Sequence, residues 1–390
     1  MKKNGFIMST YVYILLVFFL LLLGTMLVVL NNTRLLANKI KENTDGNIDF
    51  NLVLKGDKEI FIVKDSEYTE PGCIATTFDG EKLVTYITNL YEDSITRASN
   101  NLKKDNTEDK NIRYYGANPN NYVRFNNELW RIIGIFGNNV KLIRSEKIGN
   151  LSWDSSESSI NSGWGVNEWS QSDLKNYLNT MYYGGAEVTC YGGRNNTTTT
   201  CPTNKLDDAS KSLIDNHTWN TGAIDGTDAT ISNQETFALN TVPFYNAERG
   251  SVNGKICSSG IACNDTVERT TTWTGYVGLP YPTDWAYASS ESVCETNMQT
   301  KDDSNVYICK NNNWMQRSAW TWYLSPGVQS ANANYVWTVS GNGNVANYIM
   351  FGAMSKFAYY GSNVAPSIYL KSSVLMKGGT GTSSDPYKLA

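Results

Sequence analysis

The chain has 390 residues, a formal net charge of −4 and a charged fraction of only 18%. This length allows one large domain or two ordinary ones, and the slightly acidic balance excludes the basic field that nucleic-acid binding requires. Aromatic residues reach 12%, which is typical of a β-rich core and equally of an aromatic binding surface.

The N-terminus carries a long apolar segment. Residues 6–30 contain no charged side chain, and at about 1.5 Å per residue a helix of that length crosses the roughly 30 Å hydrocarbon core of a bilayer. The next four residues, Asn-Asn-Thr-Arg, lack the small side chains of a signal-peptide cleavage site. We therefore predict a retained signal anchor in which residues 1–48 form a transmembrane helix and a short stalk. The membrane is then a partner, and the protein is single-pass.

The first residues also resemble another kind of N-terminus. Lys3-Asn4-Gly5-Phe6 followed by a long apolar helix is similar to the start of a type IV prepilin. The resemblance implies cleavage after Gly5 and assembly through the helix, although pilins carry Glu where this chain has Thr10. A pilin-like or cell-envelope assembly component is therefore the alternative to a simple anchor.

Two segments connect the anchor to the rest of the chain. Residues 49–80 alternate β-branched and polar side chains between turns, which predicts a small β-rich segment that resembles a fragment of an immunoglobulin-like module. Residues 81–109 are predicted to form a helix and a linker, and the charged run 103–110 is predicted to be a solvated loop. The apolar stripe of the helix recurs with helical spacing and consists of Leu83, Tyr86, Ile87, Leu90 and Tyr91.

From residue 112 onward the pattern indicates an antiparallel sheet. Short strands are expected between residues 122 and 146, joined at Asn126-Asn127 and at a second turn over 137–139. Both turns are rich in Asn and Gly, which accept the positive φ of tight hairpins.

Two helices are expected to pack on this sheet. The first spans residues 170–183, with Ser170 and Asp173 approximating a capping box. Its apolar stripe consists of Leu174, Tyr177, Leu178 and Met181. The second is a short helix over residues 205–215.

The seven cysteines indicate an oxidising, extracellular environment. Six of them fall into neighbouring pairs whose spacings match neither zinc nor redox motifs. Local disulfides are the preferred interpretation, while the full connectivity stays open and Cys73 is left over. The pairs are Cys190 with Cys201, Cys257 with Cys263, and Cys294 with Cys309. The C-terminal domain is accordingly placed outside the cell.

Motifs for catalysis and metal binding are missing from the sequence. His217 is the single histidine, so it cannot form a multi-histidine metal site, and no nucleophile elbow or phosphate-binding loop accompanies it. Scattered Asp and Glu residues leave a carbohydrate-active enzyme as a less favoured alternative. We expect no enzyme activity and no cofactor, with calcium as the one ion that an oxygen-rich loop such as Asn342 to Asn347 can bind.

A series of stretches in fixed order resembles a family of bacterial membrane-anchored surface proteins with an uncharacterised domain. They lie at residues 111–136, 168–179, 276–288, 311–326, 336–345 and 379–389. That domain resembles the C-type-lectin-like fold of the formylglycine-generating enzymes, or sulfatase-modifying factors. The resemblance implies that residues 110–390 form an α+β ectodomain with an antiparallel sheet, one or two helices and long loops that display a ligand surface. Where family members have Arg before Pro, this chain has Ala365.

Between residues 312 and 387, aromatic, Gly and Asn residues crowd together and charge nearly disappears. The tryptophans at 314, 320, 322 and 337 are expected in the core. Aromatic rings offer contact area at low entropic cost, and amides offer adaptable hydrogen bonds. We therefore expect a non-enzymatic, adhesin-like surface protein that binds an unknown extracellular glycan or protein. The candidate contact residues are Tyr335, Trp337, Asn342, Asn347, Tyr348, Phe351, Lys356, Tyr359 and Tyr360.

Overall fold

The computed structural model divides the chain into two compact units, Met1–Thr77 and Phe78–Ala390. It describes residues 53–55, 59–61, 80–156, 165–222, 224–225, 241–249, 270–296, 312–317, 319–329, 332–339 and 357–390. The predicted anchor and stalk lie outside these residues. Within them, no helix combines the length and the apolar character needed to cross a bilayer. In the first unit, β1 (Val53–Lys55) pairs antiparallel with β2 (Glu59–Phe61).

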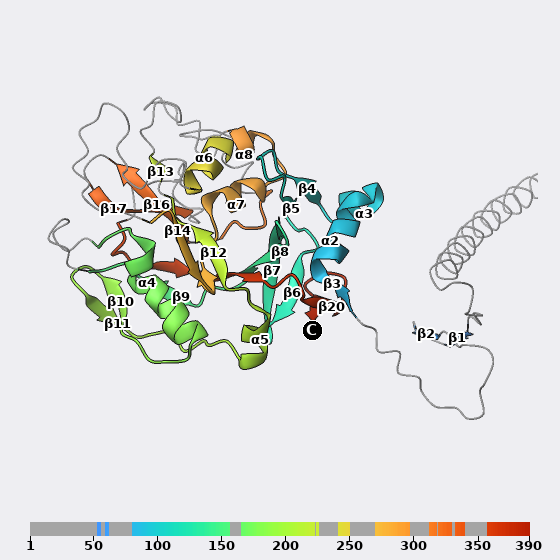
Figure 1. Ribbon diagram of the computed structural model, residues 1–390, viewed down its shortest axis with the longest axis horizontal. Helices are drawn as coiled ribbons and strands as arrows, with labels where there is room; N and C mark the ends of the chain where they lie inside the picture. The colour runs from blue at the N-terminus through green and yellow to red at the C-terminus, as the bar shows by residue number, and fades with distance from the viewer. Residues whose placement is uncertain are drawn as a thin grey trace, which may run out of the picture. The chain divides into compact units, whose positions relative to one another are not determined.

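The second unit is built on a ten-stranded sheet. Its main path runs β15-β19-β8-β7-β6-β21-β20-β3, with β5 added to β7 and β4 to β5 (Figure 1). The strands are β3 (Glu81–Lys82), β4 (Leu102–Lys104), β5 (Ile112–Tyr114), β6 (Tyr122–Phe125), β7 (Glu128–Phe136), β8 (Asn139–Arg144), β15 (Val277–Gly278), β19 (Ser367–Leu370), β20 (Leu375–Gly378) and β21 (Tyr387–Leu389). The two ends of the unit's chain therefore meet in one sheet, since β3 pairs with β20.

The β6–β7–β8 meander confirms the predicted hairpins. Asn126 and Asn127 have φ of 54° and 56° in the first turn, and Gly137 has φ of 57° in the second. The register slips between Ile132 and Gly134 of β7. A Cβ at Gly134 would lie 2.2 Å from the Ile112 carbonyl oxygen, so only glycine lets β5 approach β7 at this bulge.

A five-stranded second sheet runs β13-β16-β18-β9, with β17 paired to β16. Its strands are β9 (Gly149–Leu151), β13 (Ile224–Asp225), β16 (Thr321–Gln329), β17 (Asn332–Val339) and β18 (Ser362–Val364). Two further pairs are β10 (Cys190–Gly193) with β11 (Thr197–Thr199), and β12 (His217–Asn220) with β14 (Thr272–Gly275). The fold is thus a mixed α+β arrangement with mostly strands, few helices and long loops.

Short helices surround the sheets. Figure 1 shows α6, α7 and α8 gathered at one end of the unit and α2 beside β3 and β20. The helices are α2 (Leu83–Glu92), α3 (Ser94–Ser99), η1 (Trp169–Gln171), α4 (Asp173–Asn176), η2 (Tyr177–Tyr183), α5 (Asp208–Leu213), α6 (Thr241–Glu248), α7 (Pro282–Tyr287) and α8 (Val293–Thr296). The predicted helix over 83–91 is confirmed as α2, and residues 81–109 belong to the same unit as the sheets.

The helix predicted over 170–183 is present, but its beginning differs from the prediction. Ser172, not Ser170, is its N-cap, and the Ser172 hydroxyl accepts a hydrogen bond from the Lys175 backbone N–H. Ser170 belongs to the 3₁₀ turn η1, which Glu168 caps. After α4 the helix widens into the π-helical η2. All four predicted stripe residues are buried, as an amphipathic helix on a sheet requires.

The core is unusually rich in tryptophan. Among the described residues, seven tryptophans are among the largest fully buried side chains, including Trp322 and Trp337. Trp314 is also buried, whereas Trp320 is only half-buried. Of the tryptophans expected in the core, Trp320 is therefore the one that reaches solvent.

A cluster of charged side chains lies inside this core, and we call it the buried ionic cluster. Arg113 of β5 donates to Asp105 at 2.7 Å and to Asp284 of α7 at 2.8 Å. Lys141 of β8 donates to the other oxygen of Asp284 at 2.6 Å. All four side chains are at most 1% exposed. Burial opposes these charges, and their mutual attraction and hydrogen bonds offset that cost.

The prediction of a solvated loop over residues 103–110 is wrong at its centre. Counting the backbone as well as the side chain, Asp105 is only 3% exposed, and Thr107 is fully buried. The Asp105 carboxylate accepts hydrogen bonds from Thr107, Asn111 and Arg113. Those contacts lower the pKa of Asp105 despite its burial. Arg113 of β5 stabilises this charge inside the core, and the local sequence around Asp105 does not reveal that pairing.

Replacing Asp105 with alanine should destabilise the protein by about 3–5 kcal/mol, because Arg113 would lose one of its two carboxylates while remaining buried. Chemical denaturation of the full chain measures this loss. The matched control is Asp208→Ala, which removes an ion pair to Lys211 whose aspartate is 99% exposed and which should cost less than about 1 kcal/mol. Similar losses in the two variants would contradict the structural role of the buried ionic cluster.

Candidate binding surface

Three aromatic side chains near the C-terminus form a stacked group, which we call the aromatic cluster: Phe357, Tyr359 and Tyr360. The ring centroids of Phe357 and Tyr359 lie 5.7 Å apart with planes only 8° apart. Tyr359 and Tyr360 are 4.4 Å apart. Tyr360 is 40% exposed. In the described part of the chain, Ile95 is the one other large apolar side chain that is exposed. The cluster therefore presents ring surface to solvent.

The backbone of the aromatic cluster is fastened to the segment after β9. The Ala358 carbonyl oxygen accepts from the backbone N–H groups of Trp153 at 2.8 Å and Asp154 at 3.1 Å. The Ser152 hydroxyl donates to the Tyr359 carbonyl oxygen at 2.6 Å. Ala358 is fully buried, so the small side chain in the middle of the cluster points inward while its aromatic neighbours reach the surface.

The β10–β11 hairpin lies beside the aromatic cluster. The Ser152 backbone N–H donates to the Tyr191 carbonyl oxygen at 2.8 Å. A Cβ on Gly361 would lie 3.4 Å from the Gly192 carbonyl oxygen, so the two backbones run close together. Between the strands, Arg194 is exposed, and its positive charge acts on Tyr359. The hairpin therefore adds a cation to the surface that holds the rings.

Polar side chains complete the same surface. Asn195 and Asn196 form the hairpin turn with φ of 53° and 55°, a conformation that asparagine tolerates better than most residues. The threonines of β11 are exposed throughout. Rings, a guanidinium, amides and hydroxyls are thus presented on adjacent segments.

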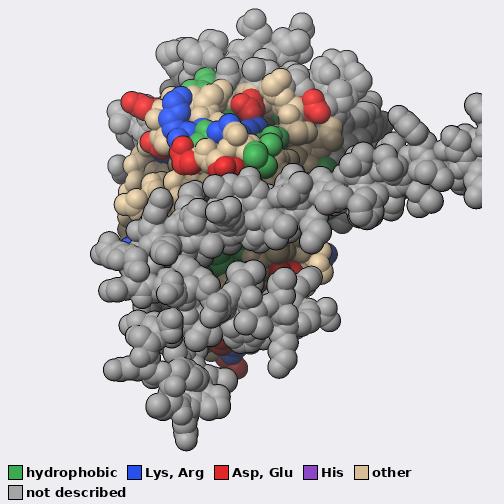
Figure 2. Space-filling model, turned by 90° about the vertical axis from the view of Figure 1, so that its right-hand side faces the viewer, with side chains coloured by type: hydrophobic (Ala, Val, Ile, Leu, Met, Phe, Trp, Pro, Cys, Tyr) green, Lys and Arg blue, Asp and Glu red, His purple; other side chains and the backbone are tan. Residues whose placement is uncertain are grey.

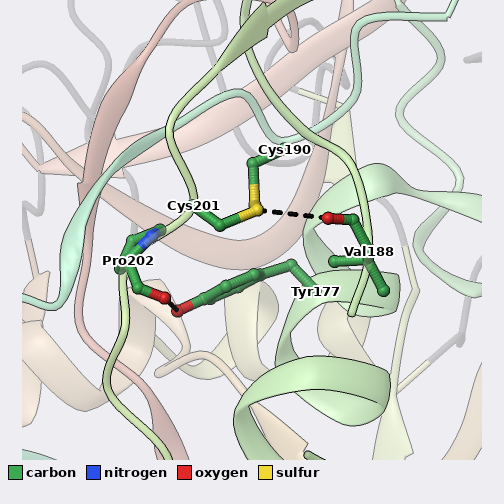
Figure 3. Close-up of a disulfide and its surroundings, with 5 residues drawn as sticks. All are labelled: Tyr177, Val188, Cys190, Cys201 and Pro202. Atoms are coloured by element: carbon green, nitrogen blue, oxygen red, sulfur yellow. Dashed lines mark hydrogen bonds between the residues drawn. A yellow bond between two sulfur atoms is a disulfide. The ribbon is translucent and has the colours of Figure 1, made fainter. Parts of the chain in front are cut away.

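A disulfide holds the base of the hairpin. Cys190 and Cys201 are bonded with a Cα–Cα distance of 5.2 Å, which confirms the predicted pairing (Figure 3). Cys201 Sγ lies 3.3 Å from the Val188 carbonyl oxygen, a contact rather than a donated hydrogen bond because a disulfide sulfur carries no hydrogen. Tyr177 of η2 donates its hydroxyl to the Pro202 carbonyl oxygen at 3.2 Å. The hairpin is thereby tied to the helix beneath it.

The other predicted disulfides fall mainly outside the described residues. Cys294 is disulfide-bonded and buried. Its partner lies outside the described residues, and the cysteines there are Cys73, Cys257, Cys263 and Cys309. The local pairings of those cysteines remain predictions.

Replacing Cys190 and Cys201 together with serine should lower the free energy of unfolding by about 3 kcal/mol, because the bond closes a loop of 11 residues in the unfolded chain. Chemical denaturation of the full chain measures the change. Hydrogen exchange should also accelerate in residues 190–199, while exchange in β7 and β8 is unchanged under native conditions. Equal exchange rates in the hairpin of both proteins would show that the disulfide does not hold this surface.

Asp154, whose backbone N–H donates to Ala358 of the aromatic cluster, carries a buried carboxylate. Its carboxylate accepts from the Ser156 hydroxyl at 2.5 Å and from the Val166 backbone N–H at 2.6 Å. Burial, reinforced by the negative charge of Asp173, raises the pKa of Asp154 to about 6. Asp173 in turn accepts from the backbone and hydroxyl of Ser155. Near neutral pH the protein therefore holds an ionised carboxylate in a site that favours its neutral form.

The raised pKa of Asp154 has a defined effect on stability. Between pH 4 and 6 the folded chain binds more protons at this site than the unfolded chain, so stability should fall as pH rises through this window. Asp154→Asn should remove this part of the decline and stabilise the protein at pH 7 by on the order of 2 kcal/mol. Unfolding curves at several pH values measure it. Asp208→Asn, at an exposed site, is the control and should leave the pH profile unchanged.

The predicted contact residues separate into distinct groups. Tyr359 and Tyr360 belong to the aromatic cluster. Trp337 of β17 is 2% exposed and packs edge-to-face on Phe244 at 4.9 Å, so its side chain is part of the core. Tyr335 lies in β17 opposite Gly327, and its side chain is not described. The remaining predicted contacts lie outside the described residues: Asn342, Asn347, Tyr348, Phe351 and Lys356.

Sequence reasoning missed Phe357 and the hairpin residues Arg194 to Thr199. The run Asn195-Asn196, which follows two glycines and Arg194 and precedes a run of threonines, is a local turn signal, so the hairpin itself could have been predicted. Its position beside the aromatic cluster was not, because residues 190–199 and 357–361 are brought together only by tertiary packing.

The single histidine makes contacts within the fold. His217 Nδ1 lies 3.0 Å from Asp215, and the His217 ring stacks on Tyr369 at 3.7 Å. Burial lowers the pKa of His217. No group of three or more His, Cys, Asp and Glu side chains in the described ranges is arranged to hold a metal ion. The calcium loop predicted at 342–347 lies outside those ranges.

Surface charge on the described part of one face is mixed rather than segregated. Figure 2 shows Lys and Arg side chains interspersed with Asp and Glu. Examples of near opposite charges are the pairs Lys103–Glu295 and Lys104–Glu92. Such alternation gives no extended positive field on this face.

The comparisons with known proteins found no relative. No family model matches the chain, and neither the curated proteins nor the solved structures contain a significant match. The function must therefore be argued from the surface itself.

Proposed function

We propose that this protein is a membrane-anchored, extracellular, adhesin-like surface protein that binds a glycan or protein ligand without catalysis. The observation that carries the proposal is the aromatic cluster, whose exposed member Tyr360 is 40% accessible and packs at a tilt against Tyr359. Exposed tyrosines that are held in place by a rigid scaffold are characteristic of recognition surfaces.

Rigidity is the second argument for binding. The backbone of Phe357 to Tyr360 is held by hydrogen bonds to the segment after β9, and the adjacent hairpin is closed by the Cys190–Cys201 disulfide. A ligand that stacks on these rings therefore meets a surface that is already ordered. Pre-organised contacts lose less conformational entropy on binding, so they yield more net affinity.

The composition of the surface favours a polar ligand with apolar faces. Arg194 can donate in a planar fork, and the neighbouring asparagines and threonines can both donate and accept. Sugar rings and aromatic-rich peptides both present apolar patches surrounded by hydroxyl or amide groups. The surface suits either ligand, and the binding experiment below distinguishes them.

The finer features of the proposal come from the sequence. A mixed α+β fold with long loops fits the C-type-lectin-like architecture that the resemblance implies. The apolar segment 6–30 would anchor the chain as a single-pass protein with the domain outside the cell. An extracellular location agrees with the Cys190–Cys201 disulfide, because such bonds persist in oxidising environments.

Binding to arrays of glycans and extracellular-matrix proteins tests the proposal directly. The full chain in detergent micelles should bind at least one class of ligand, and the double variant Tyr359→Ala, Tyr360→Ala should weaken that binding at least about tenfold, which corresponds to about 1.4 kcal/mol.

A second stacked tyrosine pair provides the matched control. Tyr183 and Tyr276 lie 4.1 Å apart with planes 7° apart, on η2 and just before β15. Replacing both with alanine should leave binding within about twofold. No binding above background by a folded wild-type chain would overturn the proposal, as would equal losses in the two double variants.

A further inference from the structure

The contact between Lys141 and Asp284 differs from an ordinary ion pair in its surroundings. The Lys141 Nζ atom lies 2.6 Å from Asp284 Oδ2, and both side chains are 0% exposed. The two residues are separated by 143 positions in the sequence, and they join β8 to α7. An amine in hydrogen-bond contact with a carboxylate oxygen is also within near-attack range, about 3–3.5 Å, of the carboxylate carbon.

Aromatic rings enclose the amine of Lys141. Its Nζ atom lies 3.9 Å from the ring centroid of Tyr281. Three more rings stand between 5.3 and 5.4 Å away, those of Phe136, Trp219 and Tyr369. Burial among these four rings lowers the pKa of Lys141 to about 8. A desolvated lysine of this kind reaches the neutral, nucleophilic form far more readily than an exposed one.

The carboxyl group of Asp284 is held in a fixed orientation. Oδ2 faces Lys141 and also accepts from the Tyr281 backbone N–H at 2.8 Å. Oδ1 accepts from Arg113 at 2.8 Å. The two cations lower the pKa of Asp284 against the effect of burial. An ionised carboxylate resists attack, so a proton must reach Oδ2, while Arg113 is positioned to stabilise negative charge that develops on Oδ1.

A further buried carboxyl group, that of Glu248, lies next to α7. It is 0% exposed at the end of α6 and accepts from the backbone N–H and hydroxyl of Thr283, the residue before Asp284. Burial raises the pKa of Glu248 to about 7. The charge of Glu248 acts on both Lys141 and Asp284.

We propose that Lys141 and Asp284 form an intramolecular amide cross-link between β8 and α7. The Nζ–Cγ bond forms and the Cγ–Oδ2 bond breaks. Oδ2 leaves as water with two protons that were originally on the Lys141 ammonium group, whose Nζ atom lies 2.6 Å from Oδ2. The ammonium and carboxylate are thus converted into one amide and one water, and the step requires no oxidant, reductant or further reactant.

The structure favours the amide over the ion pair for two reasons. Two buried charges are replaced by one neutral group, which removes a desolvation cost. The amide carbonyl would keep the hydrogen bond from Arg113, and Asp105 would still neutralise that guanidinium at 2.7 Å. For a surface protein the cross-link would tie the main sheet to a helix encoded far along the chain.

Peptide mapping of the purified full chain tests the proposal. After reduction and alkylation, a tryptic digest should contain a joined pair of peptides linked through Lys141 and Asp284, with the summed mass less one water. Cleavage after Lys141 should be absent because the modified lysine is no longer a trypsin site. Linear peptides cleaved after Lys141, without any joined pair, would overturn the proposal. This readout does not depend on processing of the N-terminus.

Replacing Lys141, and separately a control lysine, tests the same proposal. Lys141→Arg keeps the charge but lacks the reactive primary amine, so the joined pair should disappear. Lys211→Arg is the control, because Lys211 makes a 3.0 Å contact with an aspartate that is 99% exposed, and the joined pair should persist. If Lys141→Arg fails to fold, the wild-type digest still decides the question.

Discussion

The buried ionic cluster is the constraint on which the rest of the fold depends. Arg113, Lys141 and two aspartates lie at most 1% exposed, and burying such charges is favourable only when every partner is in place. Those partners come from the segment after β4, from β5, from β8 and from α7. A misaligned sheet would leave an uncompensated charge in an aromatic core. The cluster therefore penalises alternative registers more strongly than apolar packing does, because methyl groups and rings tolerate small shifts and charges do not.

The proposed binding surface lies next to β9 and β18 of the second sheet, whereas the strands that carry the buried ionic cluster belong to the ten-stranded sheet. Its rings are positioned by backbone hydrogen bonds from residues 152–154, next to a hairpin that a disulfide closes. The tryptophans show how the aromatic residues divide between the core and the surface. Most of those described are fully buried, so the aromatic content that suggested a recognition surface mainly fills the core. Among the described residues, Tyr360 is the exposed large aromatic side chain, and Tyr359 and Phe357 pack beside it.

Local sequence signals predicted local structure well. The asparagine pair at 126–127 specified its hairpin because the turn needs positive φ at both positions. The stripe of α2 was visible because helical periodicity is a property of neighbouring residues. The pairing of Cys190 with Cys201 followed from short separation. The N-cap at Ser172 was assigned two residues too early, because a 3₁₀ turn capped by Glu168 precedes the helix and the serines at both positions look equally suitable in sequence.

The sequence by itself determined the central hairpins, the helix at 83–91 and most of the helix at 170–183, one disulfide and the surplus of aromatic residues. Tertiary structure alone decided which charges are buried and which rings are exposed. Asp105 lies in a run that reads as a solvated loop, yet Arg113 holds it inside the core. Lys141 reads as an ordinary strand residue, yet it meets Asp284 from across 143 positions. The physical reason is that burial and pairing depend on partners distant in the chain, while turn and helix preferences depend on adjacent residues.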